Sequence, residues 1–469
     1  MKKFKLIQIL TLGLFMVACT KNDEYLDVDL STYNSDTYVP TLVDNWISEN
    51  ITKPYNIEVV YRFERNLTDV SKDIAPVKYD KVQPIMEAVH DGFIKAYAKV
   101  GGETFIKTYT PKQFVLYGSG SYNTNGSITL GTAEGGRKIV LYSLNEIDFE
   151  NPDMSLDGSN TVRRRLRTIH HEFTHIVNQI VAIPPAFEQI SKADYEADWT
   201  NNDSNPESVS RSLGFISRYA RSAYTEDFAE VTAHLLVQGQ LWYDQYAKAS
   251  GEEAYTKLKQ KEAIVVDYFN EYFNIDFKEL QREVQRVLHE NYGDITNQSF
   301  AYWLKQGNLI SSLGISPTNA HYAKYGTSSK FDAIFQSAKT AVAAVGNAGR
   351  TLNELEFSFL NATDLEVIMY YNNTAGSHYQ AFYSFSMAVD EHTGEVTFTK
   401  VAQRGADEGV WSNAEIVADG FTPIQDYLTS HTFIADWLPG NVETEDWLRL
   451  GGFYVKDEVD NYFYGGLTF

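Results

Sequence analysis

Apolar and polar residues alternate in a way that divides the chain into a mixed first part and a strand-rich last part. Short apolar runs predict strands at 57–63, 114–117 and 138–144, and a helical spacing of apolar residues predicts a helix at 82–100. Further helical patterns lie at 161–180, 223–238, 253–272 and 277–290. Beyond residue 310, a predicted helix at 330–345 precedes predicted strands at 355–360, 365–371, 382–389 and 395–401.

These patterns predict an α+β fold of two domains. A chain of 469 residues is longer than one compact domain usually is. We expect a leader at 1–18, a tether at 19–50, an α+β domain at 51–310 and a smaller β-rich domain at 311–469. The Gly/Ser/Asn-rich segment at 118–126 is predicted to be a loop.

The charge balance excludes one class of partner. With 40 basic and 62 acidic residues, the net charge is −22, so the phosphates of a nucleic acid would be repelled. An acidic surface also keeps a protein soluble, and this is the simplest reason for the charge. We therefore expect no nucleic-acid partner.

The first residues have the pattern of an export signal. Three lysines precede an apolar stretch at 6–17, and this stretch ends at Cys19, the only cysteine of the chain. The run Met-Val-Ala-Cys resembles the lipobox of bacterial lipoproteins, which implies lipidation of Cys19 and a membrane anchor. The following Lys-Asn-Asp-Glu resembles the tag that directs lipoproteins of the Bacteroidota to the outer cell surface. An ordinary signal peptide with an incidental cysteine is the alternative.

The segment RTIHHEFTHIVNQI contains an HExxH pattern made by His171, Glu172 and His175. The two histidines are one helical turn apart, so their imidazoles point in the same direction. They lie on the side of the predicted helix opposite an apolar stripe formed by Val162, Leu166, Ile169, Phe173, Ile176 and Ile180. This arrangement predicts a pair of metal ligands facing a cleft.

A catalytic zinc ion needs a third protein ligand and keeps its fourth position open. The best candidates lie in SAYTEDFAEVTAHLLVQG, where Glu226 and Glu230 are one turn apart and face away from an apolar side. Thr225 is a plausible N-cap of this helix, and acidic residues are favoured in a first turn in any case. His234, two turns after Glu226, stays open as an alternative third ligand.

HEFTH followed by EDFAE resembles the gluzincin metallopeptidases. The resemblance implies one zinc ion per chain, Glu226 as the third ligand and Glu230 as an outer partner of a ligand histidine. The segment GFISRYARSAYTEDFAE is similar, more narrowly, to zinc metallopeptidase lipoproteins of the Bacteroidota that are associated with TonB-dependent substrate import. This likeness covers about residues 50–300 and implies a zincin-like domain, with an import complex as a partner. Tyr219, seven residues before Glu226, matches the position of a tyrosine that assists the transition state in lethal-factor-like gluzincins.

Residue chemistry is consistent with peptide hydrolysis. Glu172 is rotated by 100° from His171 and could reach a water molecule as general base and then acid. Tyr219 would donate to the oxyanion of the tetrahedral intermediate. The predicted strand at 138–144 would be the edge along which an extended peptide lies.

Two functions from different classes fit the chain. The first is an outer-membrane zinc endopeptidase, facing the cell exterior and acting on protein or peptide. The second is a non-catalytic surface lipoprotein that binds substrate for a nutrient-import system. The sequence favours the endopeptidase, because a binding scaffold needs neither Glu172 nor Tyr219.

Overall fold

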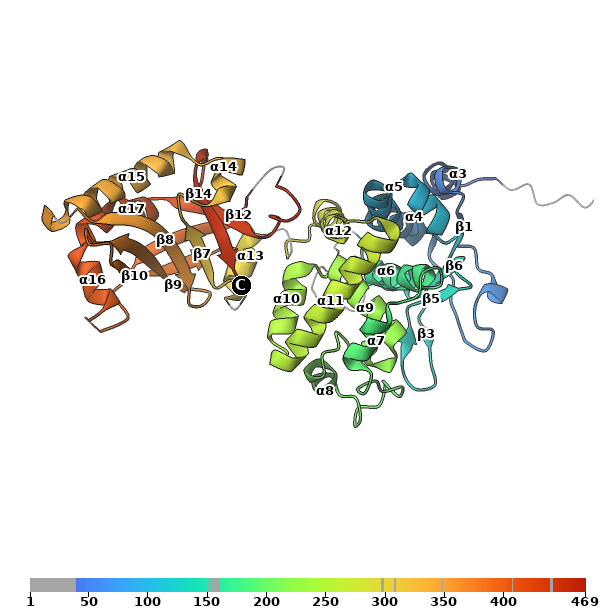
Figure 1. Cartoon of the computed structure of the whole chain (residues 1–469). Coiled ribbons are helices and arrows are strands. Elements are labelled where there is room, and N and C mark those ends of the chain that lie inside the picture. Colours follow the sequence, from blue (N-terminus) through green and yellow to red (C-terminus); the bar gives the residue numbers. More distant parts are fainter. Residues whose placement is uncertain are drawn as a thin grey trace, which may run out of the picture. The chain divides into compact units, whose positions relative to one another are not determined.

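The computed structural model describes residues 39–149, 152, 161–296, 299–307, 309–347, 349–406, 408–438 and 442–469. Figure 1 shows the order of the helices and strands along the chain. The predicted leader and Cys19 lie outside the described residues. Within the described ranges, no helix is both long enough and apolar enough to cross a membrane. The domain boundaries at residues 50 and 310 stay predictions.

A small mixed sheet begins the α+β part. Its strands follow the order β1 (Glu58–Val60), β2 (Gln113–Leu116), β6 (Lys138–Leu141) and β5 (Gly131–Glu134). The first three strands are parallel, and β5 pairs antiparallel with β6. The apolar runs of β2 and β6 are buried because both strands lie inside the sheet.

The prediction that 138–144 forms the edge strand is therefore wrong. β6 is an inner strand, and β5 forms the edge. The predicted loop at 118–126 also contains a strand, β3 (Ser121–Tyr122), which pairs with β4 (Ile128–Thr129) in a small hairpin.

A long helical segment packs against the helix that carries the HExxH pattern. It runs through α4 (Tyr79–Val89), one π-helical turn (His90–Lys95) and α5 (Ala96–Tyr109). Gly92 lies in the π-helical turn, where a Cβ atom would come within 2.8 Å of the Leu166 side chain. The missing side chain lets the two helices approach closely.

The HExxH helix, α6, spans Val162–Asn178. Thr161 is its N-cap, and the Thr161 side chain accepts a hydrogen bond from the amide of Arg164. The predicted apolar stripe is buried except for Ile180, which follows the end of the helix and is 51% exposed. Ile180 therefore does not belong to the buried face.

The remaining helices of this part are α7 (Pro185–Ser191), α8 (Glu207–Ser212), α9 (Tyr224–Val237), α10 (Gln240–Lys248), α11 (Glu252–Phe273) and α12 (Phe277–Tyr292). Among them, α9 packs against α6, and the others pack against α9 or α11. The three long helices predicted here are confirmed to within two residues at each end. Thr225 is not the N-cap, because α9 begins one residue earlier, after Ala223.

A fully buried ion pair joins α9 to α11. Lys261 Nζ lies 2.7 Å from Asp227 Oδ2, and both side chains are 0% exposed. Tyr195 donates its hydroxyl hydrogen to the same carboxylate oxygen at 3.0 Å, and Lys261 donates to the carbonyl oxygen of Gly214 at 2.8 Å. Each charge is thus compensated inside the low-dielectric interior.

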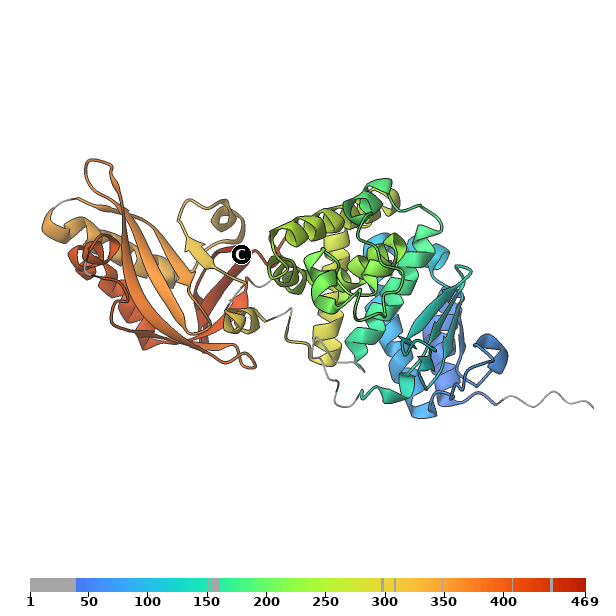
Figure 2. The same ribbon diagram turned by 90° about the horizontal axis from the view of Figure 1, so that it is seen from below.

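The last part of the chain forms a closed eight-stranded barrel, which Figure 2 shows from below. Its strands are β7 (Ser312–Ile315), β8 (Thr351–Phe359), β9 (Asp364–Asn372), β10 (His378–Val389), β11 (Glu395–Lys400), β12 (Thr432–Trp437), β13 (Leu450–Val455) and β14 (Glu458–Thr468). Neighbouring strands are antiparallel, and β14 closes the barrel by pairing with β7. The predicted β-rich character is confirmed.

Short and long helices accompany the barrel strands. They are α13 (Phe300–Gln306), α14 (Ala320–Tyr325), α15 (Ser329–Ala344), α16 (Val410–Ile416) and α17 (Ala418–Ser430). Phe331 and Tyr427, from α15 and α17, pack on the barrel residue Phe463, so the two helices share the barrel's core.

Replacing Lys261 by Met should destabilise the protein by about 3 kcal/mol, because the buried Asp227 carboxylate would lose its counterion. Thermal unfolding of the full chain measures the loss. Lys248→Met, which changes an exposed lysine at the end of α10, is the matched control and should have an effect below about 0.5 kcal/mol. Equal effects of the two variants would contradict the role given to the buried pair.

Candidate metal centre

His171 and His175 of α6 and Glu226 of α9 converge on one point. His171 Nε2 and His175 Nε2 each lie 3.1 Å from Glu226 Oε2, and the two nitrogens lie 3.0 Å apart. Among the described residues, these three form the group whose ligand atoms could hold a metal ion. The helical spacing of the histidines and the packing of α6 on α9 produce this convergence.

The donor set fits a zinc ion. Two imidazole nitrogens and one carboxylate oxygen are ligands that zinc accepts, and three protein ligands leave a fourth position for water or substrate. Zinc bonds of about 2.1 Å in a tetrahedron would place neighbouring ligand atoms roughly 3.4 Å apart. The observed separations of 3.0–3.1 Å are close to that spacing.

The electrostatics of the group also favour a cation. Burial alone would raise the pKa of Glu226, but hydrogen bonds from His171 and His175 hold it well below its usual range. Burial opposes the charged form of His171, yet its contacts with Glu226 and Glu230 raise its pKa to about 10. Negative charge on α9 thus attracts a positive charge to this place, either a proton or a metal ion.

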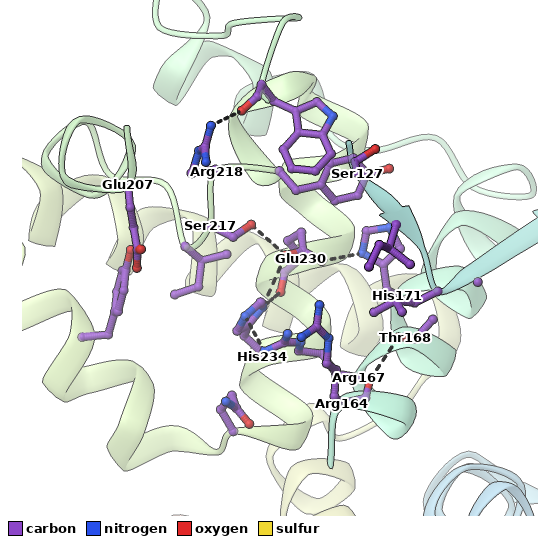
Figure 3. Close-up of a pocket in the computed structure, with 18 of the residues that line it drawn as sticks. Ser127, Arg164, Arg167, Thr168, His171, Glu207, Ser217, Arg218, Glu230 and His234 are labelled. Carbon is purple, nitrogen blue, oxygen red and sulfur yellow. Dashed lines mark hydrogen bonds and ion pairs between the residues drawn. The ribbon is translucent and has the colours of Figure 1, made fainter. Parts of the chain in front are cut away.

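Glu230 lies behind His171 and orients its ring, as Figure 3 shows. Glu230 Oε1 is 2.9 Å from His171 Nδ1, and Glu230 Oε2 accepts from the hydroxyl of Ser217 at 2.7 Å. A carboxylate at Nδ1 fixes the ring so that Nε2 points toward Glu226. Sequence reasoning missed Ser217, although it lies in the segment GFISRYARSAYTEDFAE, because the resemblance assigns no role to it.

Glu172 is buried beside the two histidines. Its carboxylate accepts a hydrogen bond from the amide of Ala133 in the edge strand β5. Burial raises its pKa, while the neighbouring His171 and His175 oppose that shift. A carboxylate with a raised pKa is suited to take up and release a proton.

Gly131 allows the edge strand to approach this helix. A Cβ atom on Gly131 would lie 2.5 Å from Thr168 Cγ2 and 3.4 Å from Glu172 Oε1. Only glycine therefore lets β5 lie close enough for Ala133 to reach Glu172.

Tyr219 precedes α9 and stacks on His171, with ring centroids 5.7 Å apart. Burial is the first cause that raises its pKa far above the usual value, and a hydrogen bond to Glu226 adds to it. The phenol therefore keeps its proton and can act as a donor. Trp199 also contacts this ring, with centroids 5.0 Å apart.

His234, the alternative third ligand, does not join the cluster. Its Nε2 lies 3.2 Å from Arg167, and its Nδ1 lies 2.7 Å from the carbonyl oxygen of Glu230. Burial lowers its pKa to about 4, and its ring stacks on Trp242 at 5.5 Å. The structure therefore favours Glu226 over His234. His170 is confirmed as a buried helix histidine, which lies 3.2 Å from the carbonyl oxygen of Gly92.

A cleft of about 1040 Å³ opens beside His171 and Glu172. The β3–β4 hairpin, α6, α9 and α10 contribute to its walls. Its lining includes Arg164, Arg167 and Trp242, none of which the sequence analysis singled out. Arg164 is seven residues before His171, so helical spacing could have indicated that they share a face.

Comparison with known proteins identifies the family. Residues 36–278 match the family described as "Putative zinc-binding metallo-peptidase", and the chain belongs to this family. A solved structure, described as a putative zinc-binding metallo-peptidase from Bacteroides caccae, is 31% identical; the match covers 54% of this chain and 93% of that one, with a TM-score of 0.45. No curated protein matches the chain.

Replacing Gly131 by Ala should destabilise the protein by about 1–3 kcal/mol, because the added methyl group overlaps Thr168 Cγ2. Adding Thr168→Ser removes that methyl group and should restore most of the stability. Thermal unfolding of the single and double variants measures both effects. Gly466→Ala is the control, because a Cβ atom there meets nothing within 4 Å. A double variant no more stable than Gly131→Ala would contradict the proposed contact.

Proposed function

We propose that the chain is a zinc-dependent endopeptidase whose metal ligands are His171, His175 and Glu226. The observation that carries the proposal is the convergence of their three ligand atoms within 3.1 Å. A zinc ion held there would polarise the scissile carbonyl and acidify the attacking water. Membership of a zinc-binding metallopeptidase family supports this reading.

Glu172 would act as general base and then as general acid. It is adjacent to the first ligand histidine, and its buried carboxylate has a raised pKa. It would take the proton of the attacking water and pass it to the leaving amine.

Tyr219 would stabilise the oxyanion of the tetrahedral intermediate by donating its phenolic proton to it as a hydrogen bond. The stacking of its ring on His171 supports this role. The substrate would lie in the cleft next to β5, whose edge faces no further strand of its sheet and could pair with an extended peptide.

The first residues resemble the leader of bacterial lipoproteins, and this resemblance supports a location of the enzyme at the cell surface. We propose that Cys19 carries a lipid anchor and that the enzyme lies on the outer membrane, facing the cell exterior, with a TonB-dependent import complex as a partner. Radiolabelled palmitate incorporated into the wild type and lost in Cys19→Ser tests the anchor.

Zinc content tests the ligand set. The full chain without its leader, purified without chelator or affinity nickel, should hold about one zinc ion by elemental analysis, and Glu226→Ala should lose most of it. Glu207→Ala removes a carboxylate that lines the same cleft but lies outside the cluster, and it should keep the metal. Zinc lost from His234→Ala and kept by Glu226→Ala would overturn the assignment in favour of His234.

Peptide cleavage tests the two catalytic roles. Glu172→Gln should lower kcat by about 10²–10⁴-fold with zinc retained, because the base is lost and the ligands are not. Tyr219→Phe should lower kcat by about 100-fold. Tyr224→Phe is the control for Tyr219, because Tyr224 is 39% exposed and is not one of the described residues that line the cleft; its activity should be within twofold of the wild type.

A zinc-loaded wild type that cleaves no member of a diverse peptide library would favour the alternative of a non-catalytic binding lipoprotein. Full activity in Glu172→Gln would contradict the proposed mechanism.

A further inference from the structure

The cleft beside His171 is rich in arginine, although the chain as a whole has a net charge of −22. Four arginines line it: Arg164, Arg167, Arg211 and Arg218. They lie in a cleft next to a candidate catalytic centre, where a substrate would meet them. Three glutamates line the cleft as well, so the arginines exceed them by one, whereas acidic residues predominate in the chain as a whole. This local excess of positive charge favours a substrate with negative charge.

Two of the three carboxylates that line the cleft are bound to other groups. Glu230 uses one carboxylate oxygen at His171 Nδ1 and the other at the hydroxyl of Ser217. Glu172 accepts from the amide of Ala133. Two of the carboxylates that line the cleft are therefore already engaged in holding the site together.

Three of the four arginines already have partners. Arg167 contacts Nε2 of His234, and Arg218 donates to the carbonyl oxygen of Trp199 at 3.1 Å. Arg211 stacks on the ring of Tyr246 and donates to the hydroxyl of Ser250 at 3.1 Å. These contacts hold their guanidinium groups in the walls of the cleft.

Arg164 differs from the other three. Among the described residues, its guanidinium group forms no hydrogen bond and no ion pair with a carboxylate, and its Nε, like that of Arg218, is buried without a partner. Burial lowers its pKa, the negative charge of Glu230 partly opposes that shift, and an arginine stays protonated. A partly buried charge of this kind is stabilised when a ligand supplies a carboxylate.

The position of Arg164 in α6 is unusual for a structural residue. The first turn of α6 contains no acidic residue, although the helix dipole favours negative charge there. The adjacent arginines are held by the fold: Arg163 pairs with Asp294, and Arg165 donates to the carbonyl oxygen of Ser143. Arg164 lines the cleft instead, and the helix terminus adds to its attraction for an anion.

Arg164 and His171 lie on one face of α6, two turns apart. Seven residues of helix span about 10 Å along the axis. An extended peptide covers that distance in about three residues. A group bound by Arg164 would therefore lie near the bond to be cleaved.

We propose that the cleft selects peptides that carry a carboxylate within about three residues of the scissile bond, and that Arg164 binds this carboxylate. This proposal rests on the endopeptidase function and adds its substrate class. An acidic side chain and the C-terminal carboxylate of a short peptide present the same chemistry to a guanidinium group, which can bind either with two parallel hydrogen bonds.

A paired peptide library tests the proposal. It contains acetylated decapeptides in which each sequence occurs with Glu or with the isosteric Gln, and with a free or an amidated C-terminus. The wild type should cleave the carboxylate forms with kcat/KM about tenfold higher or more, as expected for a charge-assisted hydrogen bond. Preference for Glu identifies a side-chain carboxylate, and preference for the free acid identifies the C-terminus.

Arg164→Gln should reduce this preference to within about twofold of unity and leave cleavage of the uncharged forms within about threefold of the wild type. Arg164→Lys keeps the charge and should retain part of the preference. Arg137→Gln removes an exposed arginine that does not line the cleft and should leave the preference unchanged. A wild type that does not prefer carboxylates, or a preference that survives in Arg164→Gln, would overturn the proposal.

A binding measurement distinguishes failure of this proposal from failure of the proposed endopeptidase function. Fluorescein-labelled members of the same library are titrated against Glu172→Gln by fluorescence anisotropy, which needs no turnover. If the wild type cleaves nothing, the endopeptidase function fails, and the Kd values then decide the question of substrate class. Carboxylate forms that bind about tenfold more tightly support the role of Arg164, and equal Kd values for the two forms reject it.

Discussion

The site depends on a single imidazole held from both sides by two carboxylates of one helix. Glu226 Oε2 lies 3.1 Å from His171 Nε2, and Glu230 Oε1 lies 2.9 Å from His171 Nδ1. Because the two glutamates are one turn apart on α9, the packing of α6 against α9 decides whether both contacts can form. Gly92 and Gly131 let neighbouring segments pack closely on α6, and the buried pair of Asp227 and Lys261 joins α9 to α11.

The same contacts explain why the site favours a cation. Glu172, Glu226 and Glu230 gather around two imidazoles in a largely buried place, where like charges repel strongly. A proton on His171 or a metal ion relieves that repulsion. Metal binding and the stability of this part of the chain are therefore expected to be coupled. Arg164, which precedes His171 in α6, places a positive charge in the cleft beside this cluster of carboxylates.

Helical periodicity was enough to predict the framework of the site. It predicts the ends of α6 and α9 to within two residues. It also predicts that His171 and His175 share one face of α6 and that Glu226 and Glu230 share one face of α9. These relations are local, since residues four apart in a helix are neighbours whatever the rest of the fold does.

The features that the sequence pattern does not predict depend on contacts between distant segments of the chain. β5 reads GTAE and carries no apolar run, because as an edge strand it is only partly buried. The apolar run of β6 does not show whether the strand is inner or edge, and in the fold β6 lies buried between β2 and β5. Closure of the barrel requires Gly466 to pair with Gly314, which no local pattern indicates. The arginines of the run RRRLR have different roles, which depend on what each of them contacts in the folded chain.

Anomalous diffraction at the zinc absorption edge, from crystals of the zinc-loaded chain, would test the central claim most directly. The account predicts one strong peak at about 2.0–2.2 Å from Nε2 of His171, Nε2 of His175 and a carboxylate oxygen of Glu226. A peak bound by His234 in place of Glu226, or no peak between α6 and α9, would contradict it.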